Sequence, residues 1–326
     1  MTTTINVSLS QTVVDVGEQV TVVAERPIVQ KDKTSSMAAV SSDEISAMPV
    51  QEVADVLELQ AGLVRDGVGG IHVRGGRSGE VAYWVDGIAA TDGYSGNMGV
   101  QVENSSVQEL QVISGTFNAE YGQAMSAVVN IVTKEGGEKM HGEFSSFVGD
   151  YFSYDDDTYW VLEPSSDEIS AIRSPQEGTY TKTNPLRSFN PIYNVQGSLS
   201  GPLLKDKLTF FVTGRYFSND GYLYGKRWFT PQGLKGDGEL VSMNPFAKFS
   251  GQGKLAYRLN GNMKLTYTLM GNQNNFRWYD SYYKYNPDAN YKRFENALNN
   301  TLTFTHTVSM RTFYEVKYTH SSTDYK

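Results

Sequence analysis

The sequence predicts an α+β domain followed by antiparallel strands of a transmembrane β-barrel that is incomplete within this chain. Residues 107–134 contain two β-branched runs separated by small residues, which indicates two closely packed, buried strands. After His141, runs of about ten residues alternate between apolar and polar side chains, as the strands of a lipid-facing barrel do. Alternation alone also fits a soluble sandwich, but short turns here alternate with long connectors, which favours the barrel.

The N-terminal part of the chain consists of short β patterns. Residues 5–9 alternate apolar and polar side chains, and residues 12–16 form a second apolar run. Residues 18–27 are rich in valine and end at Pro27, which stops a strand from continuing. An extended strand without a partner can pair with the sheet edge of another protein. The alternative interpretation is that residues 18–27 form the last strand of an upstream β-sandwich.

Two short helices are expected after a polar linker at residues 28–39. Residues 41–44 (SSDE) can cap the first helix, which Pro49 ends. The second helix is predicted to be amphipathic because its apolar side chains recur at helical spacing. These side chains are Val53, Val56, Leu57 and Leu59.

Two glycine-containing turns follow. Residues 74–79 (RGGRSG) do not form a phosphate-binding loop, because no Lys-Ser/Thr pair follows and the next segment has a strand pattern. We expect a structural turn there, with Arg74 paired to a carboxylate. Asp86 and Gly87 form a turn pair between two β runs, so the Asp86 carboxylate is predicted to be structural.

The C-terminal strands are predicted from their two faces and their connectors. In one run Leu208, Phe210, Val212, Gly214 and Tyr216 share one face, opposite Thr209, Thr213 and Arg215. Tight turns are expected at residues 203–207, at Asn260-Gly261 and near Ser309, and long connectors at residues 151–190, 219–247 and 272–295. This pattern predicts about seven strands, too few to close a barrel around a domain.

Four motifs occur in the order found in the plug domain of TonB-dependent outer-membrane receptors, and the chain resembles that family through them. The motifs are residues 53–64 (VADVLELQAGLV), residues 71–76 (IHVRGG), residues 83–88 (YWVDGI), and residues 120–122 (EYG) with 130–134 (NIVTK). The resemblance assigns structural roles in the plug to Arg74, Gly75, Asp86, Gly87, Tyr121, Gly122 and Asn130.

The resemblance also implies a division of the chain. Residues 1–17 would end a carboxypeptidase-regulatory-like β-sandwich, residues 18–35 would hold the TonB box and a linker, residues 36–138 the plug, and residues 139–326 the N-terminal part of the barrel. The TonB box would comprise Glu18, Gln19, Val20, Thr21, Val22 and Val23. The first residues lack the basic start and apolar core of a signal peptide, so the chain is expected to be a fragment cut at both ends.

The function implied by the resemblance is active transport of a ligand across the bacterial outer membrane, with the plug gating the barrel and no chemical conversion. The ligand would be a siderophore, vitamin, glycan or peptide. The implied partners are TonB with its inner-membrane energising complex, outer-membrane lipid, the ligand and, as a further candidate, a surface lipoprotein. No cofactor and no metal are expected.

Candidate ligand contacts lie in polar loops that contain aromatic residues. By resemblance, the apical loops of the plug touch the ligand, which makes Tyr94 and Asn97 candidates; a solvated turn is the alternative. Aromatic rings offer flat faces to sugars or catechols, which adds Trp160 and Trp228 in the long connectors. The competing interpretation places connector aromatics at the membrane interface, and Trp278 and Tyr279, near a strand end, favour it.

Composition excludes several other functions. The chain has no cysteine, and its four histidines lack metal-ligand spacing. Its net charge of −8 argues against a nucleic-acid-binding protein. Acidic residues 155–157 could hold calcium but lack EF-hand spacing, so a solvated loop is preferred. Two rival classes are a β-rich surface adhesin, which would have evenly spread connector lengths, and a glycoside hydrolase, which would need a rigid acid pair.

Overall fold

The computed structural model describes residues 36–67, 69–115, 117, 121–122, 124–155, 157–164, 178–187, 189 and 191–326. All of the described residues belong to one compact unit, Ser35–Lys326. The expected sandwich end at residues 1–17 and the expected TonB box, Glu18–Val23, therefore lie outside the described residues. None of the helices in the described part is long and apolar enough to cross a membrane.

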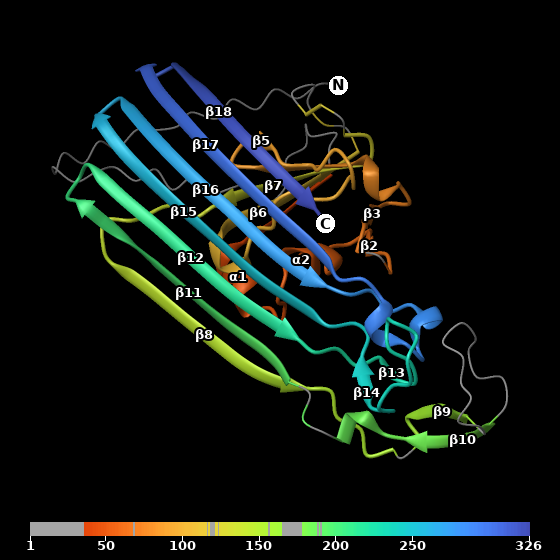
Figure 1. The fold of residues 1–326 in the computed structure, drawn as a ribbon. Helices are drawn as coiled ribbons and strands as arrows, with labels where there is room; N and C mark the ends of the chain where they lie inside the picture. Colours follow the sequence, from red (N-terminus) through yellow and green to blue (C-terminus); the bar gives the residue numbers. More distant parts are fainter. Residues whose placement is uncertain are drawn as a thin grey trace. The chain divides into compact units, whose positions relative to one another are not determined.

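The N-terminal part of this unit, here called the small domain, is built on a five-stranded sheet of order β1-β6-β7-β4-β5 (Figure 1). Its strands are β1 (Ser36–Ser41), β4 (Val81–Val85), β5 (Ile88–Ala89), β6 (Val107–Ser114) and β7 (Ala127–Thr133). β7 pairs parallel with β4 and antiparallel with β6, so it lies inside the sheet. The prediction that residues 107–134 contain two buried strands of one sheet is confirmed.

β-branched side chains of β6 and β7 form the centre of the small domain's core. Val107, Val128 and Val129 are fully buried, and apolar residues of both helices belong to the same cluster as β6 and β7. The helices are α1 (Ser42–Ala47) and α2 (Val53–Glu58), with short 3-10 turns η1 (Ser78–Glu80) and η2 (Asn104–Ser106). Ser41 and Glu44 form the capping box that starts α1, as predicted.

Three local predictions need correction. Residues 28–39 were expected to be a linker, but Ser36–Ser41 forms strand β1 along the edge of β6. Its sequence SMAAVS has no clear alternation of apolar and polar residues. Its extended conformation is therefore set by pairing with β6 and not by its own residue pattern. Leu59 was placed on the apolar face of the second helix, but it is the C-cap of α2 and is 60% exposed. Residues 63–65 were not predicted as a strand, yet β2 (Leu63–Arg65) pairs with β3 (Ile71–Val73).

The two predicted turns have left-handed backbone. Arg74 and Gly75 have φ values of 50° and 83°, and Asp86 and Gly87 have φ values of 50° and 75°. The second pair connects β4 to β5, as the Asp-Gly signal predicts. An Asp in this conformation is tolerated because its short side chain can make local hydrogen bonds. No ion pair of Arg74 is recorded among the described residues, so its expected carboxylate partner is not found there.

The C-terminal part is an antiparallel sheet of seven long strands, here called the large sheet, in the order β18-β17-β16-β15-β12-β11-β8 (Figure 1). The strands are β8 (His141–Asp150), β11 (Pro191–Leu204), β12 (Leu208–Asn219), β15 (Phe246–Asn260), β16 (Met263–Phe276), β17 (Arg293–Ser309) and β18 (Thr312–Tyr325). The predicted number of strands and the alternation of short turns with long connectors are confirmed.

The long connectors contain structure of their own. They hold the hairpin of β9 (Tyr159–Pro164) with β10 (Gly178–Thr183), the hairpin of β13 (Tyr224–Lys226) with β14 (Leu240–Ser242), and the 3-10 turns η3 (Pro185–Arg187), η4 (Ser281–Tyr283) and η5 (Pro287–Ala289). The connector expected at residues 272–295 is shorter, because β16 continues to Phe276 and β17 starts at Arg293.

The two faces of the large sheet differ as predicted. Val212, Tyr216 and Leu255 lie on the outer face and are each more than 40% exposed. Thr213 and Arg215 lie on the inner face and are almost fully buried. Hydrogen bonds from the inner face reach the small domain, so the small domain covers this face.

Candidate functional site: the contact between the small domain and the large sheet

Four ionised side chains, here called the ion cluster, join the small domain to the large sheet: Glu52, Glu103, Arg215 and Lys248. Arg215 Nη1 lies 2.8 Å from Glu52 Oε1 and 2.8 Å from Glu103 Oε2. Lys248 Nζ lies 2.8 Å from Glu52 Oε2 and 2.9 Å from Glu103 Oε1. Each carboxylate therefore contacts both cations, and the two positive and two negative charges balance.

Local structure brings the four side chains together. Glu52 is the N-cap residue of α2, and Glu103 precedes η2. Arg215 is opposite Ser250 in the register of β12 and β15, so Lys248 lies one diagonal step away on the same face. Ser250 Oγ donates a hydrogen bond to Glu103 Oε1 at 2.6 Å, so the strand also supplies a neutral donor.

The ion cluster is buried, and burial determines its electrostatics. The side chains of Arg215, Lys248 and Glu103 are each less than 5% exposed, whereas Glu52 is about one-third exposed. Burial by itself would raise the pKa of Glu103, but the Lys248 and Arg215 charges outweigh that effect. The pKa of Glu103 therefore lies below its ordinary value, and the carboxylate is ionised at neutral pH.

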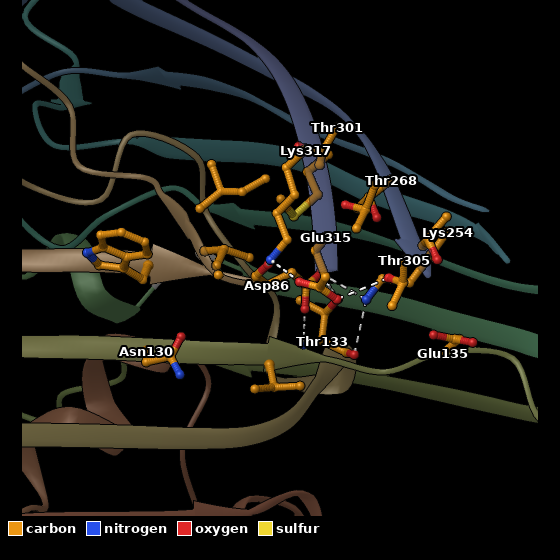
Figure 2. A pocket seen from close by; sticks show the side chains of 18 of the residues that line it. Asp86, Asn130, Thr133, Glu135, Lys254, Thr268, Thr301, Thr305, Glu315 and Lys317 are labelled. Carbon is orange, nitrogen blue, oxygen red and sulfur yellow. Dashed lines mark hydrogen bonds and ion pairs between the residues drawn. The ribbon is translucent and has the colours of Figure 1, made fainter. Parts of the chain in front are cut away.

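A second polar contact is centred on the Asp86 turn (Figure 2). The Asp86 carboxylate accepts hydrogen bonds from Thr133 N at 2.9 Å and Thr133 Oγ1 at 2.7 Å, which ties the turn to the end of β7. Lys254 on β15 lies 2.8 Å from Asp86 Oδ2 and donates to the Thr133 carbonyl. Lys317 on β18 donates to the Asp86 carbonyl at 2.9 Å. The predicted structural turn is therefore also an attachment point to the large sheet.

The backbone favours glycine at the neighbouring position, and a side chain there would also displace the end of Lys317. Gly87 has a left-handed backbone, and a Cβ there would lie 2.5 Å from Lys317 Nζ. The Lys317 ammonium, at the end of a flexible side chain, would have to move to admit a side chain at residue 87, so the positive φ is the stronger constraint.

A cavity of about 490 Å³, here called the lower cavity, lies between the Asp86 turn and strands β15–β18 (Figure 2). Its sheet side is lined by threonines of β16 and β17, including Thr268 and Thr301, with charged side chains at its rim. The lysines Lys264 and Lys317 are paired there with Glu135 and Glu315. This cavity is therefore polar and close to electrically neutral.

A larger cavity of about 970 Å³, here called the upper cavity, lies nearer the long connectors. It is bounded by α2 and the loops of the small domain on one side and by aromatic side chains of the large sheet and its connectors on the other. These aromatic residues are Phe217, Phe246, Phe276, Trp278, Tyr279 and Tyr325. Trp278 and Tyr279 line this cavity and are each 43% exposed, and their expected position at the membrane interface stays a prediction.

The predicted ligand residues are not all brought together. Asn97 lines the upper cavity, whereas Tyr94 is largely exposed, with its ring 5.6 Å from that of Tyr325. Trp160 is exposed on the β9–β10 hairpin, with Lys182 over its ring. Trp228 packs beside the buried Phe229 and Tyr285, a small cluster formed by two connectors.

The remaining predicted plug residues lie within the small domain. The Tyr121 ring contacts Trp84 edge-on at 5.2 Å between centroids. Asn130 Nδ2 lies 3.5 Å from Gln111 Oε1 across β7 and β6. Gly122 follows Tyr121 in the chain. Among the described residues, no group of His, Asp and Glu side chains could hold a metal ion.

Three members of the ion cluster, Glu52, Glu103 and Lys248, were not predicted from the sequence. Arg215 was correctly assigned to the polar face of its strand. A charged residue on the inner face of a barrel strand indicates a buried partner of opposite charge. The sequence offered no means to identify that partner, because Glu103 is 112 residues away along the chain.

Comparisons with known proteins agree with this architecture. The family model of the TonB-dependent receptor plug domain matches residues 29–129. The TonB-dependent transporter Oar of Myxococcus xanthus is 27% identical over 208 residues, which cover 60% of this chain and 18% of that protein. The chain thus spans less than a fifth of the length of this relative. The matched family and relative are receptors and transporters, in line with the expectation of a protein that is not an enzyme.

Solved structures share the fold at low sequence identity. The siderophore receptor PirA from Pseudomonas aeruginosa aligns with a TM-score of 0.58 and 16% identity, covering 89% of this chain and 40% of that one. The alcaligin outer membrane receptor FauA from Bordetella pertussis aligns with a TM-score of 0.60 and 12% identity, covering 90% and 40%. At this level of sequence identity the two alignments show a shared fold. Residues 29–129 thus match the plug domain of TonB-dependent receptors, and the chain has the fold of such a plug followed by part of the barrel sheet.

Proposed function

We propose that the full-length protein actively transports a small ligand across the outer membrane, and that the small domain is the plug that must move to let the ligand pass. The observation that carries this proposal is the polar character of the contact between the plug and the large sheet. The ion cluster and the Asp86 contacts hold the plug by charge pairs and hydrogen bonds.

Such contacts suit a plug that must be fixed against the large sheet at rest and displaced from it during transport. Buried ion pairs fix position, but they add little net stability compared with apolar packing, because desolvation opposes their attraction. In the apolar cluster of the described part, only Met270 and Ala297 come from the large sheet. Displacing the plug therefore exposes little apolar surface, and water can solvate the separated charges.

The proposed energy source is TonB, which would pair with Glu18–Val23 by strand addition. Main-chain hydrogen bonds supply most of the contact in that mode, and several bonds loaded together resist shear. Pulling on this segment would act on β1, the strand that follows it and lies at the edge of the plug sheet. The ligand would first bind in the upper cavity, where aromatic faces and amide groups are available.

The TonB contact can be tested with proline substitutions. Proline lacks an amide hydrogen, so Val22→Pro or Val23→Pro should abolish binding of the full-length receptor to the purified periplasmic domain of TonB. Both positions are needed because alternate amides point toward the partner. Val22→Ala is the matched control and should bind almost normally. If both proline variants bind TonB as wild type does, residues 18–27 are not the TonB box, and the upstream-strand interpretation gains.

A further inference from the structure

A third cavity, of about 310 Å³, lies where β12, β15 and β16 end beside the long connectors, and it is here called the rim pocket. Ser218, Ala247 and Asn275 line it and are opposite one another in the register of the three strands. Alternation along β12 places this row on the outer face of the large sheet, the face that carries Tyr216. None of the three residues lines the upper cavity, so the rim pocket reaches the side of the large sheet that faces away from the plug.

Two cations of the rim pocket lie opposite each other. Arg277 and Lys292 both line it, and Arg277 also lines the upper cavity. In the β16–β17 pairing Phe276 is opposite Arg293, so the same register continued by one residue places Arg277 opposite Lys292. Like charges in directly opposite positions repel each other and destabilise a sheet. An arrangement of this kind calls for an anion that binds both cations.

The described part of the chain supplies no such anion. Neither Arg277 nor Lys292 forms an ion pair there, and neither does Arg293 beside them. Arg277 Nε is buried without a hydrogen-bond partner among the described residues, and Arg277 Nη1 makes a long contact of 3.4 Å with the Pro287 carbonyl oxygen. Asp220 is the one carboxylate in the pocket lining, and it too forms no ion pair in the described part. A buried donor on a charged group is costly without an acceptor, so the pocket can take up a further acceptor.

The rim pocket lies at the boundary of the apolar outer face. The outward-facing aromatic residues next to it on β12, β15 and β17 are Tyr216, Phe249 and Phe294, which are 37–60% exposed. One outward-facing position further toward the connectors, the residues line the pocket: Ser218, Ala247 and Lys292. Aromatic side chains mark the end of the apolar band of a membrane barrel. The rim pocket therefore lies at the level of the lipid head groups, on the side of the long connectors.

We propose that the rim pocket binds a phosphate group of a lipid head group, with Arg277 and Lys292 as the two cations that hold it. Phosphate oxygens accept charge-assisted hydrogen bonds from guanidinium and ammonium groups, and Ser218 and Asn275 can add neutral donors. The acyl chains of the same lipid would cover the aromatic and aliphatic outer face beside the pocket. A phosphate in this position would remove the repulsion between the two cations. This proposal needs only the membrane location of the large sheet and not the transport of a ligand.

Lipid binding can be measured with the full-length receptor purified in detergent. The probe is lipid A, a bacterial membrane lipid that carries phosphate groups, and it is compared with the same lipid after removal of its phosphates. Native mass spectrometry counts the lipid molecules bound at each concentration. The phosphorylated lipid should bind the wild-type receptor severalfold more tightly. Inorganic phosphate in large excess should not displace it, because the acyl chains also contribute to binding.

Lys292→Gln is the discriminating variant, because Lys292 lines the rim pocket and not the upper cavity. Lys292 is exposed, so the receptor should fold normally. The substitution should weaken binding of the phosphorylated lipid about fivefold, the effect of one basic residue near an anionic lipid surface, and leave binding of the dephosphorylated lipid unchanged. Lys284→Gln is the matched control. It removes the same charge from an exposed residue of the same connector outside the rim pocket, and it should bind both lipids as wild type does.

Three results would overturn the proposal. Equal affinity for the two lipids would show that the cations are neutralised by something other than lipid phosphate, such as a carboxylate elsewhere in the full-length chain. Displacement of lipid A by inorganic phosphate would assign the pocket to a free anion instead of a lipid. Equal losses of binding in Lys292→Gln and Lys284→Gln would attribute lipid binding to diffuse surface charge and not to the rim pocket.

Discussion

At the scale of single residues, the plug is positioned by charges that have little access to water. Glu103 illustrates the consequence, because its carboxylate bonds Arg215, Lys248 and Ser250 at once. Removing such a group leaves buried cations without their partner, and that penalty exceeds what the intact contact contributes to stability. The ion cluster therefore acts mainly by raising the free energy of arrangements in which the plug is misplaced.

Substitution of Glu103 should loosen the plug. Glu103→Gln keeps the shape but removes the charge, so it leaves Lys248 and Arg215 with Glu52 alone and should destabilise the protein by about 3 kcal/mol. Urea unfolding of the full-length receptor in detergent, followed by tryptophan fluorescence, measures the change. Glu58→Gln, an exposed substitution at the end of α2, is the control and should have almost no effect. Equal midpoints for the two variants would contradict the role of the ion cluster.

The same residue predicts a pH dependence. The pKa of Glu103 is lower in the folded protein than in the unfolded chain, where it is about 4.3. Its contribution to stability is therefore complete above that value and is lost as the pH falls through the lower, folded-state pKa. Urea midpoints of wild type should fall more steeply in acid than those of Glu103→Gln. Parallel pH curves would show that this carboxylate does not titrate as the structure indicates.

At the scale of secondary-structure elements, local pattern and neighbouring strands contribute differently. The strongly β-branched β6 and β7 were predicted from their residues, and they are the central strands of the plug sheet. β1 was missed because its sequence has no alternation, and the edge of β6 supplies the hydrogen bonds that make it a strand. The same holds for the ends of β16 and β17, which each extend beyond the alternating run because a partner strand is present.

The central position of β7 leads to a prediction. Val129 is fully buried between β6 and β4, so Val129→Asp should cost several kcal/mol, the order of magnitude for an unpaired buried charge. Val132→Asp places the same charge on the same strand at a side chain that is 36% exposed, and it should be much milder. Urea unfolding of both variants in the full-length receptor checks the difference. Similar losses at the two sites would mean that the register of β7 is wrong.

At the scale of the whole molecule, the large sheet separates an apolar surface from a polar one. Its outer face carries exposed aliphatic and aromatic side chains, while its inner face binds the plug through polar groups. A surface of this kind is stable in water only if something apolar covers it, and lipid does so for barrel strands. This is the physical reason for the outer-membrane localisation.

The membrane prediction can be checked by fractionation. The full-length protein should be found in the outer-membrane fraction, and its electrophoretic mobility should change on heating, because a folded barrel resists detergent until it is heated. Recovery from the soluble fraction alone, with no heat-dependent mobility, would contradict the interpretation of the large sheet.

Elements whose signals lie in neighbouring residues were predictable before the fold was known. The Asp86-Gly87 turn, the capping box of α1, the buried β6 and β7, and the two faces of β12 follow from the properties of neighbouring residues. The groups that meet across the plug contact could not be predicted in this way, because they come from distant parts of the chain. Glu52 and Lys248 are 196 residues apart, and their pairing depends on the register of every strand between them. The meeting of Arg277 and Lys292 at the rim pocket likewise follows from the register of β16 and β17, because strand pairing brings together residues that a connector separates in the chain.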